Sequence, residues 1–302
     1  YKLVCTATPA PNNPEEYWSQ AGFLEKIRDG GTEIWSYFVR KGNDWVIKPH
    51  AKSAFYRWMA SWSVYMRDPA AFGFGDILST LPPPDLIEAS LPLTDEQREL
   101  MFEALGRAGV GMLADDRLPM PLRIKLAQVA RGFLYEDGAK RARRLPSHKV
   151  DYVDASVRTD VQERGQTLVW TVFDEESDIL QERLADAPFT VAALHGRLTD
   201  RARSDVLHRY LAGDVACLIS KPSLIGYGLN LQNTKAMIFS GIDDSYERLY
   251  QAIRRAVRPG QTDRVRVRTP YIRELEGVVY DNVRAKETRH LEEVALQERH
   301  YR

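Results

Sequence analysis

The chain has 302 residues, 44% of them hydrophobic and 28% charged, a balance typical of soluble globular proteins that leaves room for two domains. Lys and Arg together number 42, as do Asp and Glu, so the net charge favours no class of partner. Two cysteines, Cys5 and Cys217, make neither a disulfide framework nor a zinc site, and we expect both to be buried. No apolar run approaches the roughly 20 residues that span a bilayer. We therefore expect a cytoplasmic protein with no membrane partner and no metal site within this sequence.

The N-terminal region mixes proline breaks with aromatic segments. A short apolar run, 2–5, leads into a proline-rich stretch, after which the spacing predicts helices over 15–27 and 55–66. Five of the six tryptophans precede residue 63, and we interpret this aromatic region as a packed core rather than a ligand surface. Because Tyr1 opens the chain directly in a strand-like run, we expect the sequence to be part of a longer protein.

Two helices and a connector are predicted in the middle of the chain. Thr94 and Gln97 have the spacing of a capping box at the start of a helix that reaches about Leu105. A second helix is expected over 121–133. The basic cluster at 140–144 then forms a connector.

Strands and helices alternate from residue 166 onward. The expected strands are 167–173, 189–194, 215–220, 236–240 and 264–269, and the expected helices are 177–185, 200–211 and 246–256. This alternation predicts an α/β fold in which helices flank a parallel sheet. In such folds the functional residues lie in the loops at the carboxyl ends of the strands.

The segment Gln251–Gln261 carries the strongest chemical signal. Its spacing predicts a helix on which Arg255 and Arg258 project from one face. Two guanidiniums there suit a phosphate, because arginine stays charged and offers a planar fork of donors. A solvated arginine-rich surface with weak ion pairs is the alternative.

Taken in order, these segments resemble the motifs of superfamily 2 helicases, most closely the Swi/Snf-like translocases of bacterial or phage type. The segments that carry the resemblance are Thr6-Ala7-Thr8 (similar to motif III), 168–173 (motif IV), Leu194, Gly196 and Arg203 (a Leu-x-Gly pattern followed by Arg), Gly228–Leu231 (motif V) and Gln251–Gln261 (motif VI). This resemblance implies a RecA-like fold.

The sequence departs from the Swi/Snf pattern in motif V, which begins Ser220-Lys221-Pro222, and at Gly241–Ser245, which precedes motif VI. No Gly-x-x-x-x-Gly-Lys-Ser/Thr phosphate loop occurs. The acidic run 174–177 follows motif III, and we interpret it as a helix start rather than a magnesium-binding box. The resemblance therefore implies that most of the first lobe, with its Mg²⁺ ligands, is missing from this sequence.

The resemblance further implies an ATP-dependent DNA helicase or translocase that uses ATP and Mg²⁺. Arg255 and Arg258 would be its catalytic arginine fingers. The residues implied in ATP binding are Gln251, Gly228 and Asn230, and those implied in DNA binding or coupling are Thr6, Thr8, His195, Gly196 and Arg203. A turn-stabilising role for Asn230 and a packed loop position for His195 are the alternatives.

We expect four segments: residues 1–92 as the end of a first RecA-like lobe, 93–145 as a helical linker or protrusion, 146–275 as the second lobe and 276–302 as a closing helical segment. A non-catalytic module that binds nucleic acid or protein is an alternative reading of such a lobe. An unrelated doubly wound nucleotide or sugar-nucleotide enzyme is a further alternative, but the sequence lacks the Gly-x-Gly-x-x-Gly that such an enzyme predicts.

Overall fold

The structure is a computed structural model that describes residues 1–6, 9–10, 14–27, 32–42, 44–65, 73, 81–107, 118–135, 142–225 and 229–301. The chain divides into two compact units, which are described separately. Unit 1 consists of Tyr1–Asp76 and Asn282–Arg302, and unit 2 of Ile77–Asp281. None of the helices in the described part is both long and apolar enough to cross a membrane.

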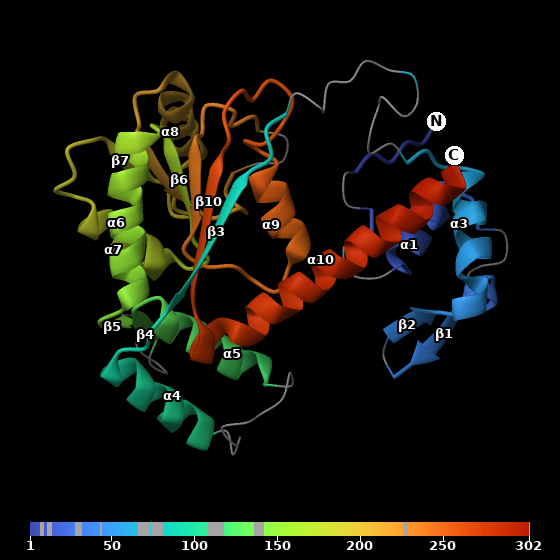
Figure 1. Ribbon diagram of the computed structural model, residues 1–302, viewed down its shortest axis with the longest axis horizontal. Helices are drawn as coiled ribbons and strands as arrows, with labels where there is room; N and C mark the ends of the chain where they lie inside the picture. Colours follow the sequence, from blue (N-terminus) through green and yellow to red (C-terminus); the bar gives the residue numbers. More distant parts are fainter. Residues whose placement is uncertain are drawn as a thin grey trace. The chain divides into compact units, whose positions relative to one another are not determined.

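Unit 2 is built around a six-stranded sheet in which every pairing is parallel (Figure 1). In spatial order its strands are β3 (Asp85–Leu91), β10 (Arg266–Ile272), β9 (Ala236–Phe239), β6 (Thr167–Trp170), β8 (Cys217–Ser220) and β7 (Val191–Ala193). The central strands β6, β8 and β9 are buried along their whole length, as a sheet covered on both faces requires. The predicted α/β fold with a parallel, RecA-like sheet is confirmed.

Helices cover the two faces of this sheet. On one face, α6 (His148–Glu163) and α7 (Asp174–Arg183) pack through Val153, Val157 and Leu180 onto apolar side chains of the central strands. On the other side lies α9 (Tyr246–Ile253), as Figure 1 shows. Another helix, α8 (Asp200–Ala212), anchors its buried Tyr210 by a 2.8 Å hydrogen bond to Thr234. The acidic run at 174–177 starts α7, as predicted.

The edge strand β3 corrects the expected organisation of the chain. Residues 85–91 were expected in the remnant of a first lobe, but they pair in parallel with all seven residues of β10. The main-chain amide of Asp85 also donates to the carbonyl of Val265 at 2.9 Å. The six-stranded sheet therefore takes its edge strand from a segment about 180 residues earlier in the chain, as the pairing of Asp85 with Arg266 shows.

A helical layer follows β3 in the chain. The capping box predicted at its start is confirmed, since Gln97 Oε1 accepts from the Thr94 amide at 3.0 Å and Thr94 Oγ1 accepts from the Gln97 amide at 3.2 Å. The helices are α4 (Asp95–Arg107) and α5 (Met120–Ala130). The second helix ends earlier than predicted, and β4 (Phe133–Tyr135) pairs with β5 (Ala142–Arg144) where a connector was expected. This layer packs on Ile272 and Leu275, close to the start of α10.

Unit 1 has an aromatic core, which confirms the interpretation of the tryptophan-rich region. Phe38, Phe55 and Tyr56 are fully buried, and Trp58 packs against them. The elements are α1 (Glu16–Phe23), α2 (Ile34–Tyr37), β1 (Phe38–Lys41), β2 (Asp44–Ile47), η1 (Pro49–Ala51) and α3 (Lys52–Ala60). Its C-terminal part belongs to α10 (Arg273–Tyr301), which begins in unit 2.

The two cysteines differ in environment. Cys217 is buried in β8, as expected, but Cys5 is exposed, and the expectation for it was wrong. The run 2–5 forms no strand, so nothing covers the Cys5 side chain. The assignment of unit 1 to a first helicase lobe stays a prediction.

Candidate functional site

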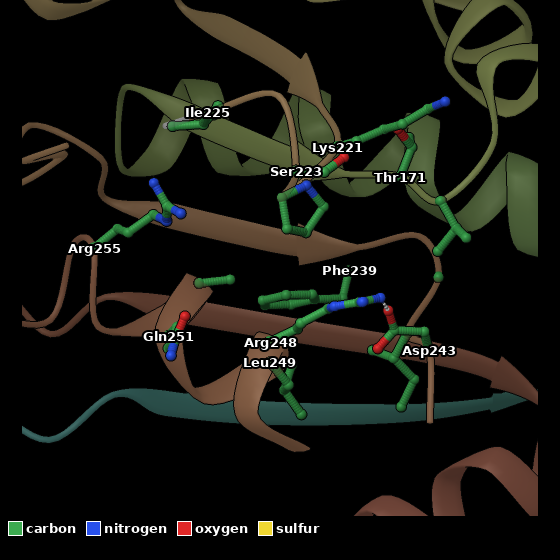
Figure 2. Close-up of a pocket in the computed structure, with 15 residues that line it drawn as sticks. Thr171, Lys221, Ser223, Ile225, Phe239, Asp243, Arg248, Leu249, Gln251 and Arg255 are labelled. Carbon is green, nitrogen blue, oxygen red and sulfur yellow. Dashed lines mark hydrogen bonds and ion pairs between the residues drawn. The ribbon is translucent and has the colours of Figure 1, made fainter. Parts of the chain in front are cut away.

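A pocket of about 330 Å³ opens at the carboxyl ends of β6, β8 and β9. Its wall includes Thr171 directly after β6, Lys221 directly after β8, and Gly241 two residues after the end of β9. The opposite wall comes from α9 and the turn after it, through Gln251 and Arg255 (Figure 2). The pocket thus lies where ligands bind in open α/β sheets.

The charged lining of this pocket is mainly cationic. It contains Lys221, Arg248 and Arg255, with Asp243 as the acidic side chain. Figure 2 shows Arg255 at one end of the pocket and Arg248 beside Asp243 at the other, where they form a 2.5 Å ion pair. The Lys221 ammonium lies 2.7 Å from a carboxylate oxygen of Asp174, at the start of α7. Three cations around one small cavity favour an anionic ligand.

The two arginines of the predicted finger motif do not share a helix face. The helix α9 ends at Ile253, so Arg255 and Arg258 lie in the turn that follows, and the predicted helix over 246–256 is too long. Arg255 lines the pocket, whereas Arg258 is not among the described residues that line it. Both side chains are partly exposed, while Ala256 and Val257 between them are buried and anchor the turn.

Gln251 lies on α9, with its side chain in the pocket wall. Its Nε2 donates to Glu247 Oε1 at 2.8 Å, one helical turn earlier. The structure therefore brings two predicted residues, Gln251 and Arg255, together in one pocket.

Asn230 is exposed and stabilises a turn. Its Oδ1 accepts from the Gln232 amide at 3.2 Å, and its Nδ2 donates to Gln232 Oε1 at 3.0 Å. This is the turn-stabilising role weighed as the alternative for this residue. Gly228, two residues earlier, lies outside the described residues.

The residues predicted to contact DNA are dispersed. His195 is only 5% exposed, because it packs at the end of β7 with Nε2 at 3.3 Å from Gln181 Oε1 and 3.6 Å from a carboxylate oxygen of Asp178. Burial, helped by the nearby Arg197 charge, lowers the pKa of His195. Gly196 is exposed with open space around its Cα, and Arg203 pairs with Asp200 on α8.

Thr6 lies in unit 1 and is exposed. Thr8 falls outside the described residues. His195 thus occupies the packed loop position weighed for it, and a direct contact between its ring and a nucleic acid would require the loop to open.

Comparison with known proteins finds relatives of the segment that contains the pocket. Residues 148–260 match the helicase conserved C-terminal domain, and this segment runs from α6 to the turn that carries Arg255 and Arg258. This segment is therefore similar to the conserved C-terminal domain of helicases. All the residues that line the pocket fall within this matched segment, whereas β3 and β10 of the same sheet lie outside it.

The same segment has a curated relative. Over 113 residues the chain is 27% identical to the ATP-dependent DNA helicase RecQ of Bacillus subtilis (strain 168), an alignment that covers 37% of this chain and 19% of RecQ. The chain thus spans about a fifth of the length of this relative.

Two solved structures are similar to this chain. The C-terminal part of the Fun30 ATPase domain superimposes with a TM-score of 0.54 and 17% identity, over 67% of this chain and 89% of that chain. The Sulfolobus solfataricus SWI2/SNF2 ATPase core in complex with dsDNA aligns with a TM-score of 0.47 and 20% identity, over 70% of this chain and 50% of that chain. At these identities the Fun30 likeness establishes the fold alone.

Several pocket residues of the helicase lobe were missed by sequence reasoning. Lys221, Asp243 and Arg248 were not among the predicted site residues, yet all line the cavity. The available signal was their position, since Lys221 directly follows a buried strand and Asp243 lies in the loop after the next one. No group of three or more His, Cys, Asp or Glu suited to a metal ion occurs among the described residues.

Proposed function

We propose that this helicase lobe completes the ATP site of a Swi/Snf-like DNA translocase of bacterial or phage type. A first lobe would hold the phosphates and Mg²⁺, and the cationic pocket would face the triphosphate. The observation that carries the proposal is the convergence of Gln251 and Arg255, with Lys221 and Arg248, in one pocket at the carboxyl edge of the sheet. Guanidinium forks match phosphate oxygens in geometry and charge.

The size of the pocket supports a partial contact with the nucleotide. About 330 Å³ lies at the lower end of the range for small-molecule sites. Such a cavity suits the phosphate end of a nucleotide that is held mainly by another surface. When bound, ATP with Mg²⁺ would supply the phosphoryl group that water attacks.

Each residue then has a defined task. Arg255 would stabilise charge on the γ-phosphate, and Arg258, in the same turn, would act with it as a second finger. Gln251 would orient the nucleotide from α9. Asn230 and Gly228 would couple the ATP site to DNA through the turn that Asn230 stabilises.

DNA is the proposed polymer, because the relative matched over this lobe is by name an ATP-dependent DNA helicase. The exposed Gly196 and its neighbour Arg197, at the end of β7, offer backbone and charge to phosphates. His195 would act by organising this loop, and Arg203, Thr6 and Thr8 would contact DNA or couple the lobes. Contacts of this kind are salt-sensitive and carry little sequence information.

The test is DNA-stimulated ATP hydrolysis by the chain joined to a first lobe. Arg258→Ala is expected to abolish turnover while DNA binding at fixed salt is retained. ATP turnover in the variant equal to that of the unmodified protein would contradict the assignment. Absence of ATP hydrolysis in the unmodified protein, with DNA or protein binding intact, would favour a non-catalytic binding module instead.

A further inference from the structure

A network of four buried charges lies beneath one edge of the pocket. Arg131, Lys149, Glu176 and Glu276 have side chains no more than 2% exposed. The Lys149 ammonium lies 2.6 Å from one Glu276 oxygen, and the Arg131 guanidinium lies 3.2 Å from the other. Arg131 also lies 3.3 Å from Glu176. Two cations and two anions leave the network neutral, so its charges are compensated.

The network contacts the segment 240–242, which we call the rim. Two of its residues, Gly241 and Ile242, line the pocket. Arg131 Nη2 donates to the carbonyl of Ile242 at 3.3 Å, and Ser240 Oγ donates to Glu176 Oε1 at 2.7 Å. Gly241 lies so close that a Cβ added to it would overlap the Arg131 guanidinium. Each of the three rim residues thus contacts a buried charged side chain, either Arg131 or Glu176.

The helix α5 also holds the loop just after the rim. Arg123 on α5 forms a 2.9 Å ion pair with Asp244, and both side chains are partly buried. Arg131 follows α5 directly, and its Nη1 donates to the carbonyl of Ala127 at 2.8 Å, which fixes the guanidinium relative to the helix. Arg123 on α5 and Arg131 directly after it therefore both hold one loop of the pocket.

Stability alone gives no reason for this arrangement. Burying four charges is costly, and well-packed apolar side chains often stabilise a core as well or better. A buried network does, however, fix groups in one geometry, because any displacement leaves a charge without a partner. Here the geometry that it fixes is that of the pocket rim.

We propose that Arg131 is a positioning residue for this pocket: by bridging Ile242, Glu176 and Glu276 it sets where the rim lies, so that α5, outside the matched helicase domain, controls the shape of the site. The identity of the ligand rests on the proposed function, whereas the positioning role does not.

The direct test is hydrogen exchange of the peptide that spans 238–246, measured by mass spectrometry on the full chain. Arg131→Met should raise exchange there by about tenfold or more, since a hydrogen bond from a charged donor is lost. Exchange in β8 should stay unchanged. Because Arg131→Met leaves a buried carboxylate short of a cation, the charge-balanced Arg131→Met/Glu276→Gln variant is measured beside it.

A matched control is Arg268→Met. Arg268 also pairs with a buried carboxylate, Asp160, at 2.8 Å, but it does not line the pocket or contact the rim. This variant should lower the melting temperature without a local rise in exchange over 238–246. If Arg131→Met and Arg268→Met show equal hydrogen exchange in the rim, Arg131 has only a general structural role, and the proposal is overturned.

A double-mutant cycle gives an independent readout. In Gly241→Ala the new Cβ would overlap the Arg131 guanidinium. Alone, this substitution should raise hydrogen exchange in the rim by about tenfold. In the Arg131→Met background it should raise exchange by much less. Additive effects of the two substitutions would contradict direct contact as the cause. If the rim responds as expected but no variant changes ATP turnover, the proposed function fails and the positioning role stands.

Discussion

The main-chain amide of Leu231 donates a 3.0 Å hydrogen bond to the carbonyl of Arg255. This bond joins the segment that resembles motif V to the arginine turn. Gln261 strengthens the junction, because its Nε2 donates to the carbonyl of Gln232 at 2.9 Å. The two segments that resemble motifs V and VI are therefore one hydrogen-bonded unit, and the position of the Arg255 backbone depends on both.

The first prediction concerns Gln261, which is 4% exposed. Gln261→Leu removes the donor to Gln232 and the acceptor for the Asp263 amide at 3.2 Å. The free energy of unfolding should fall by about 1–3 kcal/mol, the usual cost of leaving buried polar groups unpaired. Urea denaturation measures this change. The exposed Gln162→Leu on α6 is the control and should lie within about 0.5 kcal/mol of the unmodified protein.

The second prediction concerns Gly260, whose φ of +96° suits glycine and whose added Cβ would lie 2.9 Å from Gln232 Nε2. Gly260→Ala should destabilise the lobe by about 1–3 kcal/mol and displace the arginine turn, because backbone strain and a side-chain contact act together. Gly213→Ala is the matched control, since its φ is +91° but nothing lies near the added Cβ. A smaller loss in Gly213→Ala would confirm the contact; equal losses would assign the whole effect to backbone strain.

The third prediction concerns the buried pair Lys149 and Glu276. Lys149→Met leaves a buried carboxylate with one cation fewer, and the free energy of unfolding should fall by about 3–5 kcal/mol. Lys149→Met combined with Glu276→Gln should lose less stability than Lys149→Met alone, because the remaining charges of Arg131 and Glu176 balance. Thermal unfolding followed by circular dichroism measures both. Additive losses in the double variant would show that the two side chains are not energetically coupled.

The fourth prediction is a pH dependence of unit 1. Burial raises the pKa of Glu293 to about 7 from its ordinary 4.5, although Lys52 and Arg289 oppose the shift. At a pH between about 4.5 and about 7, Glu293 is protonated in the folded state but ionised in the unfolded state. Protonation of Glu293 therefore contributes fully to the free energy of unfolding below about pH 4.5, and this contribution is lost as the pH rises through about 7. Because Glu293 is partly exposed, the free energy of unfolding of unit 1 should fall by only about 1–2 kcal/mol between about pH 5 and about pH 8.

Tryptophan fluorescence reports this unfolding, because five of the six tryptophans lie in unit 1. Glu293→Gln should flatten the pH dependence. The same slope in that variant would show that another group titrates.

Local sequence signals predicted local structure well. The capping box of Thr94 and Gln97 forms as its spacing indicates, because both hydrogen bonds depend on residues three apart. The alternation after residue 166 identified five strands of the sheet. The sixth, β3, was misplaced because its partner β10 lies about 180 residues later, and pairing at such a distance leaves no local pattern.

Buried polar residues are the main reason why the sequence analysis missed parts of the structure. The helix α6 was not predicted, since its packed face contains Lys149, Ser156 and Asp160 beside Val153 and Val157, which breaks the apolar period. The network that contains Lys149 and Arg131 was missed for the same reason. Of the predicted site, Gln251 and Arg255 meet in the pocket, whereas the early end of α9 moves Arg258 into the following turn.

The most direct measurement of the central claim is DNA-stimulated ATP turnover with Arg255→Lys, in the chain joined to a first lobe. Lysine keeps the charge but loses the planar fork. We predict that turnover falls by about 10³-fold or more, as for other arginine fingers, while DNA affinity at fixed salt stays within about twofold. Unchanged turnover, or a parallel loss of DNA binding, would contradict a role for Arg255 at the γ-phosphate.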